Sequence, residues 1–242
     1  MNHEPYQSSF FELTAEGAVL ITAAVAVFFF GQNTPLMSLI IGLLILARFI
    51  ALHRRGDLVF FLMGVVLGGG NDVLSMWRGV YFYTPSTILP VPIPVWMLFF
   101  WGQGFLFLRR IVRFGPFLSP TPPTRLFDRA LALDAVIAVV YRAVVYAWAA
   151  VSYLPGALYA SILAVRLLLI PPRQDERRLM LAVLMLGPFY EFLLIKGGLY
   201  VYQNGVVLGM PIWLLVYWVF IIRVIKAVFD WVEVKLASRR PG

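Results

Sequence analysis

The sequence predicts an all-α integral membrane protein with about eight transmembrane helices in two parallel four-helix repeats. Of its 242 residues, 61% are hydrophobic and only 13% are charged, whereas a soluble domain carries about 25% charged residues. The mean hydropathy is +0.85. A motif that recurs after about 119 residues predicts the division into two repeats.

The composition also limits the chemistry. The chain has no cysteine and only two histidines, His3 and His53, which argues against disulfides, zinc sites and haem ligation. We therefore expect no cofactor and no metal. The net charge is +8, but the basic residues gather in the loops of one side, so we expect contact with the bilayer and none with nucleic acid. Residues 1–17 lack Lys and Arg and do not read as a signal peptide.

Eight apolar runs are long enough, or nearly so, to cross a bilayer of about 30 Å. They cover roughly residues 13–31, 35–52, 57–78, 93–111, 130–151, 155–171, 177–199 and 210–229. Within the third run, Gly64-x-x-x-Gly68 predicts the close approach of another backbone. We treat 1–242 as a single membrane domain, with repeat one at 13–112, a proline-rich cytoplasmic linker at 113–126, repeat two at 127–232 and a basic tail at 233–242.

The basic residues predict the topology. Arginines follow the second, fourth and sixth helices, and lysines and arginines fill the C-terminal tail, whereas the opposite loops are nearly free of charge. By the positive-inside rule, both termini face the cytoplasm and the protein is a multi-pass protein of the cell membrane. Repeats that enter the membrane from the same side are related by an axis along the membrane normal.

The repeated motif carries the candidate functional residues. It reads acid, six residues, Gly-x-Tyr-x-Tyr, a loop, Pro-x-Trp, four residues and Trp. The first copy contributes Asp72, Tyr81, Tyr83, Trp96 and Trp101, and the second contributes Glu191, Tyr200, Tyr202, Trp213 and Trp218. Two further pairs of positions repeat nearer the cytoplasmic ends, Glu16 with Asp134 and Arg48 with Arg166.

Asp72 and Glu191 each lie about 22 Å from the cytoplasmic end of their helices. A carboxylate at that depth is costly unless it faces the bundle interior, is paired or is protonated. It serves either as an interhelical hydrogen-bond staple or as a catalytic group. Arg142, in the fifth helix, has no counterpart in the first repeat. It would hold one carboxylate ionised and leave the other as an acid, or it would snorkel to helix-end carbonyls.

The aromatic residues of the motif allow two interpretations as well. They form an interfacial aromatic belt, or they line a cavity mouth and bind substrate, because alternation in an extended loop directs both rings of each Gly-x-Tyr-x-Tyr to one side. The candidate substrate-binding residues are Tyr81, Tyr83, Trp96, Tyr200, Tyr202 and Trp213.

The stretch from Asp72 to Trp101, with its Pro-containing run Leu89–Trp96, resembles carotenoid-biosynthesis hydratases of the bisanhydrobacterioruberin and carotene 1,2-hydratase type and related multi-pass families of unknown function. Asp72 stands where that family is expected to have Glu. The resemblance implies a metal-independent isoprenoid hydratase or cyclase, in which Glu191 protonates an alkene, tyrosines stabilise the cation and Asp72 orients water or removes a proton. The alternative is a non-enzymatic transporter or membrane-assembly component for a lipid or small molecule. The sequence does not reveal the oligomeric state.

The topology is testable with reporter tags. Tags at both termini and at Pro120 should report the cytoplasm, and tags near Ser86 and Asn204 should report the opposite side, because the arginine distribution requires it. A C-terminus on the opposite side from the N-terminus would contradict the even number of spans.

Overall fold

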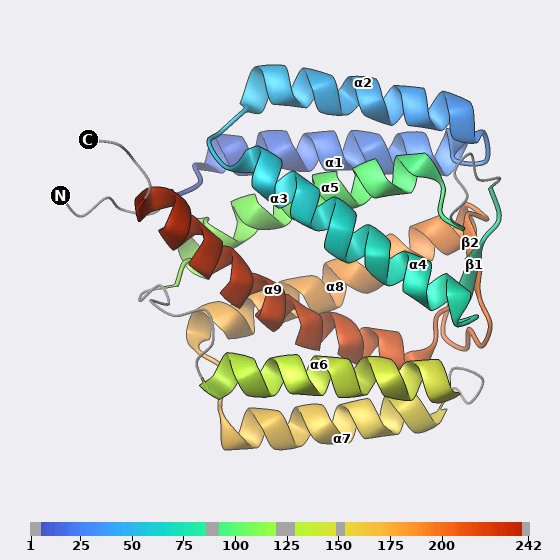
Figure 1. Ribbon diagram of the computed structural model, residues 1–242, viewed down its shortest axis with the longest axis vertical. Coiled ribbons are helices and arrows are strands. Elements are labelled where there is room, and N and C mark those ends of the chain that lie inside the picture. The colour runs from blue at the N-terminus through green and yellow to red at the C-terminus, as the bar shows by residue number, and fades with distance from the viewer. Residues whose placement is uncertain (1–5, 86–91, 120–128, 149–152, 239–242) are drawn as a thin grey trace. The chain divides into compact units, whose positions relative to one another are not determined.

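The computed structural model describes residues 6–85, 92–119, 129–148 and 153–238, which are mostly helical. The chain divides into two compact units, which we treat separately. The N-terminal unit comprises Ser8–Ile111 and Phe192–Gln203, and the C-terminal unit comprises Met1–Gln7, Val112–Glu191 and Asn204–Gly242. Figure 1 shows the order of the elements along the chain.

The N-terminal unit begins with two antiparallel helices, α1 (Phe10–Phe30) and α2 (Thr34–Leu52). Ser9 and Glu12 form a capping box at the start of α1, which satisfies amide groups that a helix terminus leaves without partners. The next helical segment runs through α3 (Asp57–Met63), a π-helical turn η1 (Gly64–Gly69) and α4 (Gly70–Trp77). Strand β1 (Tyr81–Tyr83) and helix α5 (Val95–Val112) follow.

The same order of elements recurs later in the chain. Helix α6 (Arg129–Trp148) packs on α7 (Tyr153–Leu169), α8 (Gln174–Lys196) leads to strand β2 (Tyr200–Tyr202), and α9 (Ile212–Ser238) ends the described chain. A 3-10 turn, Gly115–Phe117, precedes α6 in the chain. The rings of Tyr141 and Tyr159 stack with centroids 3.7 Å apart, and each hydroxyl donates to the backbone carbonyl of the other residue, which fixes α6 against α7.

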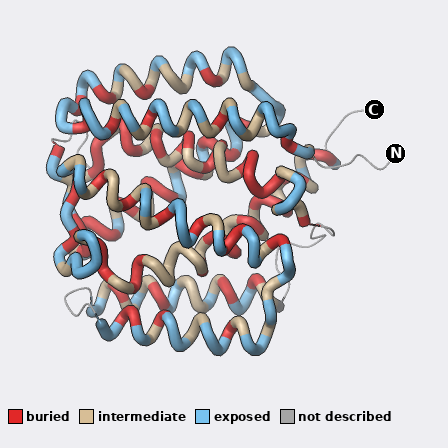
Figure 2. The backbone as a smooth tube through the Cα atoms, turned by 180° about the vertical axis from the view of Figure 1, so that it is seen from behind, coloured by how far each residue is buried: buried red, intermediate tan, exposed pale blue. Residues whose placement is uncertain are grey.

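The structure confirms the predicted class of helical membrane protein. Within the described ranges, seven helical segments are long and apolar enough to cross a membrane, and Tyr153–Leu169 is apolar but shorter. Exposed positions recur along the helices (Figure 2) and include large apolar side chains such as Ile50 and Leu168. Apolar side chains on the outside are what a lipid environment favours. The number of eight spans and their orientation stay predictions.

Two helix boundaries differ from the expected ones. Helix α9 continues to Ser238, so the part of the expected basic tail that the structure describes is helical. Charged residues lower the hydropathy there, but Asp, Glu and Lys do not interrupt a helix. Helix α8 starts at Gln174 and passes through Pro188 without ending. Residues 120–126 of the expected linker, and the start of the run Leu89–Trp96, lie outside the described residues.

The predicted close approach at Gly64 and Gly68 is present. A Cβ atom on Gly64 would lie 2.5 Å from the backbone oxygen of Trp101, and one on Gly68 would lie 2.3 Å from the Trp101 ring. Only glycine lets η1 touch α5 so closely. As a result, the indole of Trp101 lies over Gly68, one helical turn before Asp72.

The two Gly-x-Tyr-x-Tyr segments pair with each other as antiparallel strands. Tyr81 lies opposite Tyr202, Phe82 opposite Val201 and Tyr83 opposite Tyr200. The tyrosines are buried or half-buried, and the residue between them is exposed in both strands, which confirms the predicted alternation. The leading glycines, Gly79 and Gly198, have φ values of 69° and 67°, a conformation that favours glycine. The pairing itself was not predicted.

Candidate functional site

Asp72 is the centre of a polar cluster in the N-terminal unit. Its side chain is buried, and it accepts hydrogen bonds from three neutral groups. The Tyr81 hydroxyl donates to Oδ1 at 2.5 Å, and the Tyr83 hydroxyl and the Trp101 indole donate to Oδ2 at 2.8 and 2.7 Å. These bonds link α4, β1 and α5. The geometry is that of a carboxylate that acts as an acceptor.

The tyrosine rings around Asp72 touch one another. Ring centroids are 5.1 Å apart for Tyr81 and Tyr202 and 5.5 Å apart for Tyr83 and Tyr200, and Trp96 meets Tyr83 edge to face at 6.4 Å. The structure thus gathers most of the predicted motif residues in one place. We call this set the tyrosine–aspartate cluster, and it consists of Asp72, Tyr81, Tyr83, Trp96, Trp101, Tyr200 and Tyr202.

Two residues that the sequence did not single out hold the second strand in this unit. The Gln32 side-chain amide donates to the Gly198 carbonyl at 2.6 Å and to the Thr84 hydroxyl at 3.1 Å. The Thr84 amide donates to the carbonyl of Leu199 at 2.9 Å. Gln32 lies in an uncharged loop without any motif, so no pattern in the sequence pointed to it.

The remaining predicted residues belong to the C-terminal unit, namely Glu191, Arg142, Trp213 and Trp218. Glu191 is buried on α8, and the ring of Trp218 lies over Gly187, four residues earlier. Trp213 meets Tyr159 at 6.2 Å and Tyr217 at 6.4 Å. Asp72 and Glu191 lie in different units, so the expectation that one carboxylate is ionised and the other acts as an acid stays a prediction.

Arg142 lies among aromatic rings. Its guanidinium carbon is 4.8 Å from the centroid of Tyr217 and 5.5 Å from that of Tyr146. Cation–π contacts of this kind stabilise a cation where water is scarce. The expected division of work, with Arg142 holding one of the two acids ionised, stays a prediction.

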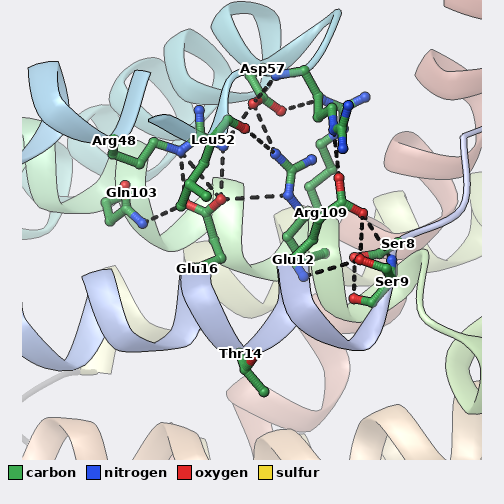
Figure 3. Close-up of polar contacts among 12 residues, drawn as sticks. Ser8, Ser9, Glu12, Thr14, Glu16, Arg48, Leu52, Asp57, Gln103 and Arg109 are labelled. Carbon is green, nitrogen blue, oxygen red and sulfur yellow. Dashed lines mark hydrogen bonds and ion pairs between the residues drawn. The ribbon is translucent and has the colours of Figure 1, made fainter. Parts of the chain in front are cut away.

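A buried charge cluster in the N-terminal unit was not predicted as such. In the N-terminal unit, Glu16 accepts from Arg48 Nε at 2.9 Å and Nη2 at 2.8 Å (Figure 3). Arg48 and Arg110 also lie 2.7 and 2.9 Å from Asp57, and Arg109 pairs with the same carboxylate. These ion pairs join α1, α2, α3 and α5. The pairs are almost completely buried, so each charge depends on its partner.

The C-terminal unit contains a similar pair between α6 and α7. Arg166 donates to both oxygens of Asp134, at 2.7 and 2.9 Å.

A second set of polar contacts surrounds Ser119, which lies in the expected linker. Its hydroxyl accepts a hydrogen bond from Lys226 Nζ at 2.7 Å and donates one to Asp230. Hydrogen bonding to Asp175 raises the pKa of the Arg173 guanidinium, which lies outside the candidate spans. These contacts are structural ion pairs.

Comparisons with known proteins agree with the fold. Residues 133–238 match a family described as "Protein of unknown function (DUF2878)". The structure resembles that of MvINS, a mycobacterial Insig homolog from Mycobacterium vanbaalenii, with a TM-score of 0.54, 20% identity and coverage of 78% of this chain and 98% of that chain. A cross-linked trimer of an MvINS variant matches with a TM-score of 0.56, 20% identity and the same coverage. No curated protein matches. The expected resemblance to carotenoid hydratases has no support in these matches.

The buried ion pairs predict unequal effects of two conservative substitutions. Glu16→Gln leaves Asp57 as the one carboxylate of the cluster that faces three buried guanidinium groups and should cost about 3–5 kcal/mol of stability. Glu12→Gln keeps a capping residue and loses the ion pair to Arg54, whose side chain is 58% exposed, which should cost about 0–1 kcal/mol. Unfolding in detergent measures both. Similar small losses for the two variants would contradict a stabilising role for the cluster.

The hydrogen bonds to Asp72 predict a structural effect of Asp72→Asn. An amide presents one acceptor oxygen and one donor group to three converging donors, so we expect a loss of about 1–3 kcal/mol. A double-mutant cycle with Trp101→Phe should yield a coupling of about 0.5–3 kcal/mol. Stability of the single and double variants in detergent gives the coupling. Additive, small effects would show that the Trp101–Asp72 bond contributes nothing.

Proposed function

We propose that the protein is a non-catalytic membrane component that binds a lipid or a similar amphiphile at the tyrosine–aspartate cluster. The observation that carries this proposal is the occupation of both Asp72 oxygens by three donors. The carboxylate thereby fastens a helix, a strand and a second helix together. An acid that is used in this way is poorly suited to deliver a proton to a substrate.

Protonation of an alkene requires an acid whose proton points at the substrate. Asp72 accepts hydrogen bonds instead, and the comparisons give no support to an isoprenoid hydratase. Catalytic roles for Glu191 and Arg142 belong to the alternative hypothesis, in which the protein is an isoprenoid hydratase or cyclase. A role in membrane assembly is compatible with the structural similarity to an Insig homolog. At 20% identity, this similarity concerns the fold alone.

The chemistry of the cluster fits an amphiphile. Tyrosine and tryptophan offer wide apolar faces together with a polar atom. Tyr81 and Tyr83 donate hydrogen bonds to Asp72, and a phenolic hydroxyl is an acceptor as well as a donor. Binding sites for small molecules commonly combine apolar walls with a few placed polar groups.

Self-association is a second part of the proposal. The MvINS variant was crystallised as a cross-linked trimer, and we propose that this protein also works in an assembly of copies. Native mass spectrometry of the detergent-solubilised protein reports the oligomeric state and the bound lipid in one measurement. A lipid-free monomer of the wild-type protein would contradict both parts.

The lipid proposal is tested by the variant Tyr81→Phe/Tyr83→Phe, which removes both hydroxyls of β1. The variant should retain less co-purified lipid than the wild type, whereas Tyr153→Phe, at a tyrosine that is 67% exposed and outside the cluster, should retain as much. Lipid extracts of cells with and without the gene provide the second readout. We expect an unchanged isoprenoid composition, and a new or missing isoprenoid product would favour the hydratase or cyclase instead.

A further inference from the structure

The helix that carries Asp72 is interrupted just before that residue. Between α3 and α4, residues Gly64–Gly69 form the π-helical turn η1, in which an amide donates to the carbonyl five residues earlier rather than four. The three pieces form one helical segment, Asp57–Trp77 (Figure 1). A π turn is rare, and where one occurs inside an α-helix it frequently lies at a functional site.

The second copy of the motif spans the same interval without a π turn. Asp57 and Asp72 are 15 residues apart, and so are their equivalents Glu176 and Glu191. In the C-terminal unit, however, α8 is α-helical over the whole interval. The same spacing is therefore found in two hydrogen-bonding registers, one with a π turn and one without.

The contacts of the tryptophans differ in parallel with the register. In the N-terminal unit, the Trp101 ring lies over Gly68 and its indole N–H donates to Asp72 at 2.7 Å. In the C-terminal unit, the Trp218 ring lies over Gly187, but its buried indole nitrogen has no acceptor among the residues that the structure describes. The bond from tryptophan to acid is thus present with the π turn and absent without it.

A change of register accounts for this difference. The wider π turn takes up about one residue more than an α turn, and one residue of an α-helix corresponds to a rotation of about 100°. If η1 became α-helical, α4 would turn by about that angle relative to α3. Asp72 would then leave the side of the helix on which Trp101 and the two tyrosines of β1 lie.

One glycine of this segment has no packing reason to be a glycine. Gly64 and Gly68 are required by the contact with Trp101, because an added Cβ would lie 2.5 Å or less from it. Gly70 would meet no neighbouring atom within 4 Å, and its φ is −62°. Its equivalent in α8 is Phe189. A glycine weakens a helix, which suits a segment that changes its hydrogen bonds.

The contacts of Asp72 hold η1 in the π register. The hydrogen bonds from Tyr81, Tyr83 and Trp101 are made only while α4 keeps its present rotation. Loss of these bonds removes what favours the π turn over the α-helix, which is the ordinary form of the chain. The register and the hydrogen bonds of Asp72 therefore depend on each other.

We propose that η1 is a two-state hinge, in which a change from the π turn to an α-helix rotates α4 and withdraws Asp72 from its three donors. The N-terminal unit shows the engaged state, in which the three bonds are made, and α8 shows the hydrogen-bonding pattern of the other state. Whatever competes for Asp72 then also shifts the register. This inference does not depend on lipid binding at the tyrosine–aspartate cluster.

Deletion of Gly70 tests whether η1 holds an extra residue. The shortened segment can be α-helical throughout while Asp72 keeps its present side, so the Tm in detergent should stay close to that of the wild type. Deletion of Gly42 is the matched control, because this glycine also has open space around it but lies in the regular helix α2. That deletion turns Arg48 away from Glu16 and should lower the Tm by about 10 °C or more, or prevent folding. Equal losses in the two variants would refute the extra residue and with it the hinge.

Spin labels measure the rotation of α4. The chain has no cysteine, so labels on Leu39→Cys in α2 and Leu74→Cys in α4, both at exposed positions, report a single pair of sites. Asp72→Ala should add a second distance that differs by up to about 8 Å, because a side chain at the helix surface moves that far in a rotation of about 100°. Glu12→Gln, which leaves the cluster intact, should keep the wild-type distance.

Deletion of Gly70 in Asp72→Ala should restore the single distance, because the shortened segment is already α-helical in the engaged rotation. A wild-type distance in Asp72→Ala, or a second distance that persists after the deletion, would overturn the proposal. If Asp72→Ala does not fold, exchange should broaden the indole N–H resonance of Trp101 in the full-length wild type, and deletion of Gly70 should sharpen it. A Trp101 resonance of equal width in both proteins would then count against the hinge in the same way.

Discussion

Burying charge inside a bilayer is the constraint on which this structure depends. A buried ion loses several kcal/mol of hydration, and only a well-placed counter-ion and further hydrogen bonds restore it. The Glu16–Arg48 pair joins α1 to α2, and the Asp134–Arg166 pair joins α6 to α7. In both cases the partners are 32 residues apart. Each pair therefore fixes one helical hairpin, and the helices that follow extend the network in their own unit.

The same constraint applies to the buried carboxylate of Asp72. Neutral donors from Tyr81, Tyr83 and Trp101 surround the carboxylate. Each donor lies on an element that must be in place before the bond can form. The carboxylate thus makes the short strand and two helices depend on one another. This dependence shows how a buried carboxylate, a residue type that often indicates function in a membrane, can hold the elements of a helical unit together.

Hydropathy and the internal repeat predicted much of the fold, because a helix in lipid must be long and apolar and because the acid, glycine and aromatic spacings occur twice. The ion-pair partners of individual charged residues could not be predicted from hydropathy or from the repeat. Glu16 was aligned with its equivalent, Asp134, rather than with its ion-pair partner, Arg48, since a repeat reveals equivalence and not contact. The extension of α9 was missed because charged side chains lower hydropathy without weakening a helix. The aromatic contacts of Arg142 depend on Tyr217, which is 75 residues away along the chain.

The register of the two short strands is symmetric with respect to the two copies of the motif. Tyr81 pairs with Tyr202 and Tyr83 with Tyr200, while the central residues Phe82 and Val201 face each other. Exchanging the two motif copies leaves this set of pairs unchanged. A contact of that kind is isologous, the form that two identical chains adopt in a symmetric dimer. A chain half as long, with a single copy of the strand, could make the same contact with a second copy of itself.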